Sequence, residues 1–151
     1  MRRLIKTVYD QSGAARQIPV TRDIFTHPVD VTSLAPGAST TVAVNFENDS
    51  SFTWIKSTYT CYKDDLEYIS EGFLYVPDIL VSVNDAGSSR NWMSSGVPLG
   101  TIAGVDGFPF ILPEPQTYRG NSTVLFSFTN YSASVTWKSI QLALIGYKEW
   151  Q

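Results

Sequence analysis

The chain has 151 residues, of which 43% are hydrophobic and 13% aromatic, and its formal net charge at pH 7 is −3. This length is typical of one domain, and such a chain buries enough apolar surface to fold without disulfides or structural metals. The single cysteine, Cys61, excludes an intramolecular disulfide, and no run of residues is long and apolar enough for a membrane-spanning helix.

The charge is unevenly distributed along the chain. Residues 1–22 contain five basic side chains and one acidic side chain, whereas the remainder is acidic overall. A basic segment on an acidic body favours docking on a neighbouring copy or on another acidic partner, and a frayed terminus with incidental charge is the alternative. The candidate partner-binding residues are Arg2, Arg3, Lys6, Arg16 and Arg22.

The first 38 residues show no clear hydrophobic period, and Pro19, Pro28 and Pro36 interrupt them. We therefore expect residues 1–38 to form an extended arm and lead-in, with one short strand at 17–25. Residues 39–151 are expected to form a single β-sandwich domain, because alternation of apolar and polar side chains begins there.

The strands expected in the body follow one another closely. Residues 42–46 and 52–62 alternate and flank a turn-forming segment, so we expect them to pair as a hairpin. A charged loop at 63–68 precedes an expected strand at 73–83, and residues 84–87 are expected to form a turn. A Gly/Pro-rich crossing loop at 96–115 and two long strands, at 124–128 and 140–145, complete the chain.

This pattern predicts an all-β protein, an antiparallel β-sandwich with an extended N-terminal arm. The long Gly/Pro-rich crossing favours a jelly-roll-like arrangement over an immunoglobulin-like one.

Residues suited to catalysis or metal binding are sparse. His27 is the only histidine, no Gly-x-Ser-x-Gly motif is present, and Cys61 is expected to be a core thiol. One cysteine and one histidine cannot make a structural zinc site, and the acidic residues Asp64, Asp65 and Glu67 are better explained as a solvated loop than as a calcium site. We predict no catalytic, metal-binding or cofactor-binding residues, hence no enzyme, and the acidic body disfavours nucleic acid.

Tryptophans offer a second kind of contact. Trp92 lies in a turn-rich segment and, with the C-terminal Trp150, is a candidate exposed aromatic contact, whereas Trp54 and Trp137 lie in expected strands and are predicted to be in the core or an interface.

Four segments of the C-terminal half form a recurring set. They read Val83-Asn84-Asp85-Ala86-Gly87-Ser88-Ser89-Arg90, Pro98-Leu99-Gly100-Thr101-Ile102-Ala103-Gly104, Pro109-Phe110-Ile111-Leu112-Pro113-Glu114-Pro115 and Leu144-Ile145-Gly146-Tyr147-Lys148. The region from Ile79 to Lys148 resembles small virion structural proteins of tailed bacteriophages. These are packing and turn motifs rather than a catalytic signature.

The resemblance implies a capsid decoration (cement) protein or a minor head or tail protein with a jelly-roll fold. Its partners would be the major capsid protein or neighbouring virion subunits, and it would form a homo-oligomer. Residues 4–13 lack the apolar core of a signal peptide, so we expect synthesis in the host bacterial cytoplasm and assembly into the virion. The alternative is a tail or connector component, or a β-sandwich module that binds a receptor or glycan.

Overall fold

The computed structural model describes residues 1–63 and 77–150. In this part the chain forms ten strands and one short 3-10 helix. They are β1 (Arg2–Tyr9), β2 (Ala15–Val31), β3 (Ser39–Asn45), β4 (Ser50–Lys63), β5 (Ile79–Asp85), β6 (Arg90–Asn91), β7 (Val97–Pro98), η1 (Leu99–Thr101), β8 (Phe110–Tyr118), β9 (Thr123–Asn130) and β10 (Trp137–Trp150).

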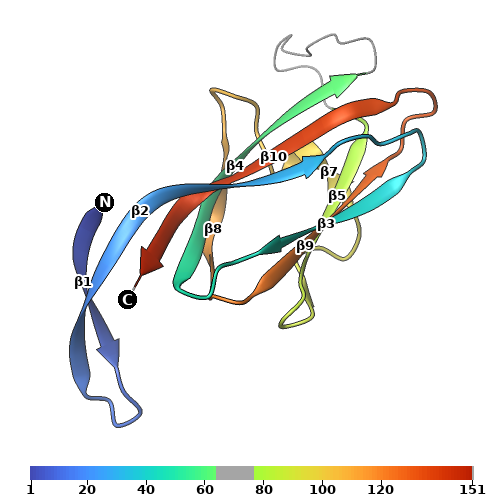
Figure 1. Cartoon of the computed structure of the whole chain (residues 1–151). Helices are drawn as coiled ribbons and strands as arrows, with labels where there is room; N and C mark the ends of the chain where they lie inside the picture. The colour runs from blue at the N-terminus through green and yellow to red at the C-terminus, as the bar shows by residue number, and fades with distance from the viewer. Residues whose placement is uncertain (64–76, 151) are drawn as a thin grey trace.

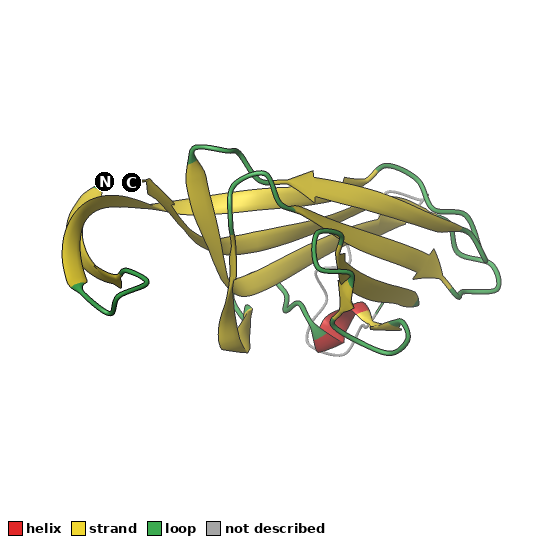
Figure 2. Ribbon diagram, turned by 90° about the horizontal axis from the view of Figure 1, so that it is seen from below, coloured by secondary structure: helices red, strands yellow, loops and turns green. Residues whose placement is uncertain are grey.

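The strands form two antiparallel sheets packed face to face (Figures 1 and 2). The first sheet has the order β1-β2-β10-β4-β8, and the second has the order β3-β9-β5-β6, with β7 also paired to β5. The predicted all-β antiparallel sandwich is therefore confirmed. Of the expected strand at 73–83, residues 79–83 belong to β5, and residues 73–76 lie outside the described part, as do residues 64–68 of the charged loop.

Most connections carry the chain from one sheet to the other. From β2 to β5, and again from β7 through β8 and β9 to β10, each strand lies in the opposite sheet from the strand before it. The expected hairpin of β3 with β4 is consequently wrong, since these strands belong to different sheets. The physical reason is that both strands have an apolar face, and crossing between the sheets brings these faces together, as shown by the stacking of Phe46, which directly follows β3, on Phe52 of β4.

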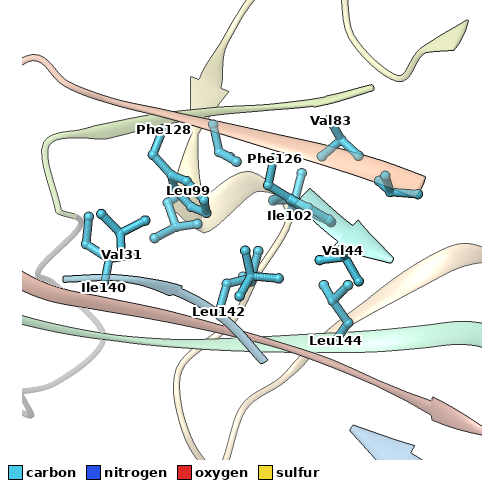
Figure 3. Close-up of a cluster of buried hydrophobic side chains, with 14 of the residues drawn as sticks. Val31, Val44, Val83, Leu99, Ile102, Phe126, Phe128, Ile140, Leu142 and Leu144 are labelled. Carbon is cyan, nitrogen blue, oxygen red and sulfur yellow. The ribbon is translucent and has the colours of Figure 1, made fainter. Parts of the chain in front are cut away.

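The core lies between the sheets. Strand β9 alternates strictly, with Val124, Phe126 and Phe128 fully buried, and β10 does the same with Ile140, Leu142 and Leu144 (Figure 3). Burial of a large apolar side chain stabilises the fold by about 2 kcal/mol, so these alternating runs are the main source of stability.

One glycine is required by the close approach of two strands. Gly146 of β10 lies beside Thr53 of β4, where β4 has a bulge, and a Cβ at position 146 would lie only 1.8 Å from the Thr53 carbonyl oxygen. A bulge of this kind bends a strand and increases the local twist of its sheet.

The N-terminal region differs from the expected extended arm. Residues 2–9 and 15–31 form strands, and β1 pairs with Ala15–Arg22 of β2, so the projecting segment is a β-hairpin (Figure 1). The second half of β2 pairs with β10, and Val29 and Val31 lie in the core. The body of the sandwich therefore begins near residue 23 rather than at residue 39. The prolines misled the sequence interpretation, because a strand accepts proline where the missing N–H would point away from its partner.

Candidate partner-binding site

A specific turn closes the N-terminal hairpin. The Asp10 carboxylate accepts hydrogen bonds from the Ser12 N–H (2.9 Å), the Ser12 hydroxyl (2.5 Å) and the Ala14 N–H (2.9 Å). The Gly13 N–H donates to the Asp10 carbonyl oxygen at 3.0 Å, and Gly13 has a φ of 82°, which glycine adopts without steric cost. These hydrogen bonds lower the pKa of Asp10, the one with the Ser12 hydroxyl having the largest effect. The tip of the hairpin is thus a defined structure rather than a frayed end.

The hairpin has apolar side chains that nothing in the described chain covers. Ile5 is 71% exposed and Tyr9 is 69% exposed. They project from the side that, further along β2, becomes the core side of the sheet, where Phe25 and His27 contact Phe52. The hairpin extends beyond the second sheet, so this side has no second layer there (Figure 2). A two-stranded ribbon is only marginally stable in water by itself, which makes the hairpin suited to contact another molecule.

An ionic cluster anchors the base of the hairpin. The Arg22 guanidinium donates to Glu149 Oε1 through Nε at 2.9 Å and through a second nitrogen, and Lys6 Nζ lies 3.2 Å from Glu149 Oε2. Burial opposes ionisation of Glu149, but hydrogen bonds from Arg22 and Lys6 outweigh it and hold the pKa below its ordinary value. Arg22 also stacks on the Tyr147 ring at 3.9 Å. These contacts join β1 and β2 to β10.

The five basic residues predicted to bind a partner therefore divide into two groups. Lys6 and Arg22 are occupied by Glu149 within the molecule. Arg2, Arg3 and Arg16 are exposed and form no ion pair with residues 1–63 or 77–150. The structure brings all five onto one hairpin, but only three are available to a partner.

A shallow groove of about 500 Å³ lies at the base of the hairpin, on the outer face of the first sheet. Its lining includes Met1, Arg2, Ile24, Ile145 and Tyr147. Ile24 is 81% exposed. Periodicity could have revealed this apolar lining, because Ile24 and Ile145 alternate with core residues of their strands, but their common location depends on the pairing of β2 with β10.

A buried cation lies at the same end of the sandwich, which the sequence did not indicate. Lys148 Nζ is 2.8 Å from Glu47 Oε2 and 3.7 Å from the centre of the Phe25 ring. The His27 ring packs against the rings of Phe25, Phe46 and Phe52. Burial, reinforced by the Lys148 charge and opposed by Glu47, lowers the pKa of His27 to about 4, so it is neutral at pH 7.

The geometry separates His27 from Cys61. In the strand register His27 is opposite Leu144 of β10 and Cys61 is opposite Ile140, four residues away. This offset corresponds to about 13 Å along the strand. The Cys61 thiol is buried, as expected for a core residue, and burial raises its pKa to about 12. These two groups are not arranged as a nucleophile and its base.

The tryptophans are less exposed than the sequence suggested. Trp92 is partly buried and stacks on Trp54, with ring centres 4.9 Å apart, and Trp150 is also partly buried. Trp54 and Trp137 are fully buried, as predicted. An apolar pocket of about 270 Å³ adjoins the stacked pair and is lined also by Met93, Phe110 and Leu112. Trp92 therefore keeps only part of its surface for the aromatic contact that the sequence suggested, because it packs on the core.

The described residues contain no group of three or more His, Cys, Asp or Glu side chains placed to hold a metal ion. Residues 1–63 and 77–150 include no helix with the length and hydropathy needed to cross a membrane. Comparison of the chain with known protein families and with curated protein sequences found no match.

Proposed function

We propose that the chain is a non-enzymatic structural protein of a tailed-bacteriophage virion, most directly a capsid decoration (cement) protein that stabilises the shell through contacts between subunits. The observation that carries the proposal is the projecting hairpin, with Ile5 and Tyr9 exposed and Arg2, Arg3 and Arg16 unpaired among the described residues. A rigid body with a projecting, adhesive ribbon is suited to joining subunits.

The fold we propose within the β-sandwich class is a jelly roll. Its support is the strand order, β2-β10-β4-β8 facing β3-β9-β5-β6, with the chain crossing between sheets at most connections. The sequence resemblance to small phage virion proteins adds to this support. The neutral His27 and the protonated Cys61 thiol, held apart, do not favour nucleophilic catalysis.

The test is the number of copies of this chain per major coat subunit in purified virions, measured by quantitative mass spectrometry. A ratio near one, or a simple fraction of it, would support a decoration protein. About a dozen copies, as one closed ring requires, would instead support a connector or tail component. Absence from virions would overturn the proposal.

A receptor- or glycan-binding module is the second candidate, and the pocket beside Trp92 favours it. Aromatic rings stack on sugar faces, but one face of Trp92 already contacts Trp54. Binding on a glycan array that is lost in Trp92→Ala and kept in Trp150→Ala would support this function. No binding to any glycan would remove it.

A further inference from the structure

Within residues 1–63 and 77–150, no strand pairs with the edge of β1 that faces away from β2. Asp10 N–H donates to the Ala14 carbonyl oxygen (3.1 Å), so Asp10 faces β2. Backbone groups alternate in direction along a strand, so Arg3, Ile5, Thr7 and Tyr9 direct their N–H and C=O groups away from β2. Pro19, which has no N–H, lies opposite Ile5, as this alternation requires. Strand β1 contains no proline or glycine that would prevent further pairing.

The part of the body that the structure describes has one strand edge of the same kind, that of β3. Phe46 N–H donates to the Ser122 carbonyl oxygen (3.0 Å), and the Ala38 carbonyl oxygen accepts from the Asn130 N–H (2.9 Å), so even-numbered residues of β3 face β9. The odd-numbered residues therefore direct their backbone groups to the outside. Strand β3 has no proline and no charge, and within the described residues it pairs only with β9.

The other long edges of the body are protected. On β2, the Ile24 N–H is occupied by the Asp23 carboxylate at 3.0 Å, and Pro28 has no N–H to donate. Strand β8 contains Pro113 and Pro115, and its pairing with β4 is interrupted there. Prolines, and side chains that occupy an outward N–H, prevent edge-to-edge pairing. Strand β3 contains no proline, and no side chain is seen to occupy its outward N–H groups among the described residues.

We propose that β1 of one copy adds to the free edge of β3 of a second copy, antiparallel, and so links copies head to tail. The free-edge residues of β1 and β3 are equal in number and spacing. The register that matches them pairs Arg3 with Asn45, Ile5 with Ala43, Thr7 with Thr41 and Tyr9 with Ser39. Figure 1 shows β1 projecting away from β3 of the same copy, so a second copy supplies the partner.

Charge selects this orientation. Antiparallel addition places Arg2 and Arg3 beside the C-terminal end of β3, which is followed by the exposed Asp49 and by Glu47, whose side chain is exposed although it also pairs with Lys148. The competing arrangement, β1 on β1 about a two-fold axis, would bring Arg2, Arg3 and Arg16 of both hairpins close together, with like charges repelling each other. A head-to-tail contact forms rings or filaments, whereas the two-fold contact stops at a dimer. A second copy is thus the partner of the hairpin, an inference that rests on the proposed function as a virion protein.

The test uses sedimentation velocity of the purified full chain over a range of concentrations, at low and high salt. We expect concentration-dependent association that weakens with salt. Ile5→Pro and Ala43→Pro each remove one outward N–H from the proposed interface and should weaken association about tenfold or more. Thr26→Pro makes the same change on the edge of β2 and should leave association unchanged. Thr41→Pro is a second β3 variant should Ala43→Pro fail to fold, and circular dichroism checks each fold.

Mixing the variants distinguishes the two arrangements. Ile5→Pro keeps an intact β3 edge and Ala43→Pro keeps an intact β1 edge, so an equimolar mixture should form a heterodimer and nothing larger. A wild-type chain that remains monomeric, or association of Ala43→Pro equal to wild type, would overturn the inference. Because the experiment contains no virion, its failure leaves the copy-number test of the proposed function intact, and the reverse also holds.

Discussion

The two halves of β2 have the same extended backbone but different surroundings. Residues 23–31 pair with β10 and face the second sheet, and Val29 and Val31 are buried there. Residues 15–22 pair with β1 and extend beyond the second sheet, so most of their side chains are exposed or only partly buried. The difference shows that strand formation and strand stabilisation are separate in this molecule. Pairing gives the hairpin its shape, but only a second layer would give it a core.

The largest expected effect is on the body. Phe126 is fully buried in β9, and Phe126→Ala should lower the free energy of unfolding by about 4 kcal/mol through lost burial and a cavity. Ile5→Ala in the hairpin should change it by less than about 0.5 kcal/mol. Urea unfolding followed by tryptophan fluorescence measures both. Equal losses for the two variants would mean that the hairpin has a core after all.

Substitutions of two glycines compare the backbone of the body with the backbone of the hairpin. Gly146→Ala should destabilise the body by about 3 kcal/mol, because the added Cβ would force β10 and β4 apart at Thr53. Gly13→Ala has open space around it, and its left-handed conformation should cost about 1 kcal/mol, confined to the hairpin tip. Thermal unfolding of the two variants gives the ranking, and a larger loss for Gly13→Ala would contradict it.

Acid should weaken the body through His27. Its pKa is about 4 in the folded chain, against the ordinary histidine value of 6.5 that applies to the unfolded chain, so the unfolded chain binds the proton first as the pH falls. The stabilisation is complete above pH 6.5 and is lost as the pH falls from there to about 4. Because His27 is only half-buried, the slope should be a fraction of about 1.4 kcal/mol per pH unit.

His27→Gln should flatten this part of the profile of unfolding free energy against pH. An unchanged slope in the variant would show that other groups cause the pH dependence.

The smallest expected effect is on the local opening of the hairpin rather than on the unfolding of the body. Glu149→Gln removes the carboxylate that holds Lys6 and Arg22, and it should make local opening of the hairpin easier by about 1 kcal/mol while barely changing global unfolding. Hydrogen exchange of β1 amides measures this, with the exposed Glu114→Gln as the matched control.

The pKa of Glu149 is lowered on folding, so the wild-type contribution is present above the ordinary carboxyl value of 4.5 and is lost as the pH falls through the folded value. Unchanged exchange in Glu149→Gln would mean that β1 is held by backbone pairing alone.

Prediction succeeded where local pattern and packing agree. The alternation of Phe126 and Phe128 predicted β9, and the turn expected at 84–87 is present but shifted, since β5 continues to Asp85 and the turn occupies residues 86–89, with the Asp85 carboxylate accepting from the Gly87 N–H at 3.0 Å. It gave no indication that β10 lies between β2 and β4, in the middle of the first sheet. The position of a strand within a sheet depends on contacts between segments distant in sequence, and no local pattern contains this information.

The candidate site was predicted only in part. The excess of basic residues in residues 1–22 identified the segment correctly as distinct from the body, but it could not indicate which of them are available. Lys6 and Arg22 are occupied because the chain returns at Glu149, more than a hundred residues later. The exposure of Ile5 likewise follows from where the second sheet ends.

The sequence by itself determined the strand-forming character of this chain, its one-domain size, its buried apolar alternation and the basic character of its N-terminus, because these depend on side-chain type and short-range order. Only the tertiary structure decided which strands cross between sheets, that the N-terminus is a projecting hairpin, and that β1 and β3 keep open edges. Those features depend on long-range pairing, where the free energy of burying apolar faces against each other outweighs the local preferences of proline and glycine.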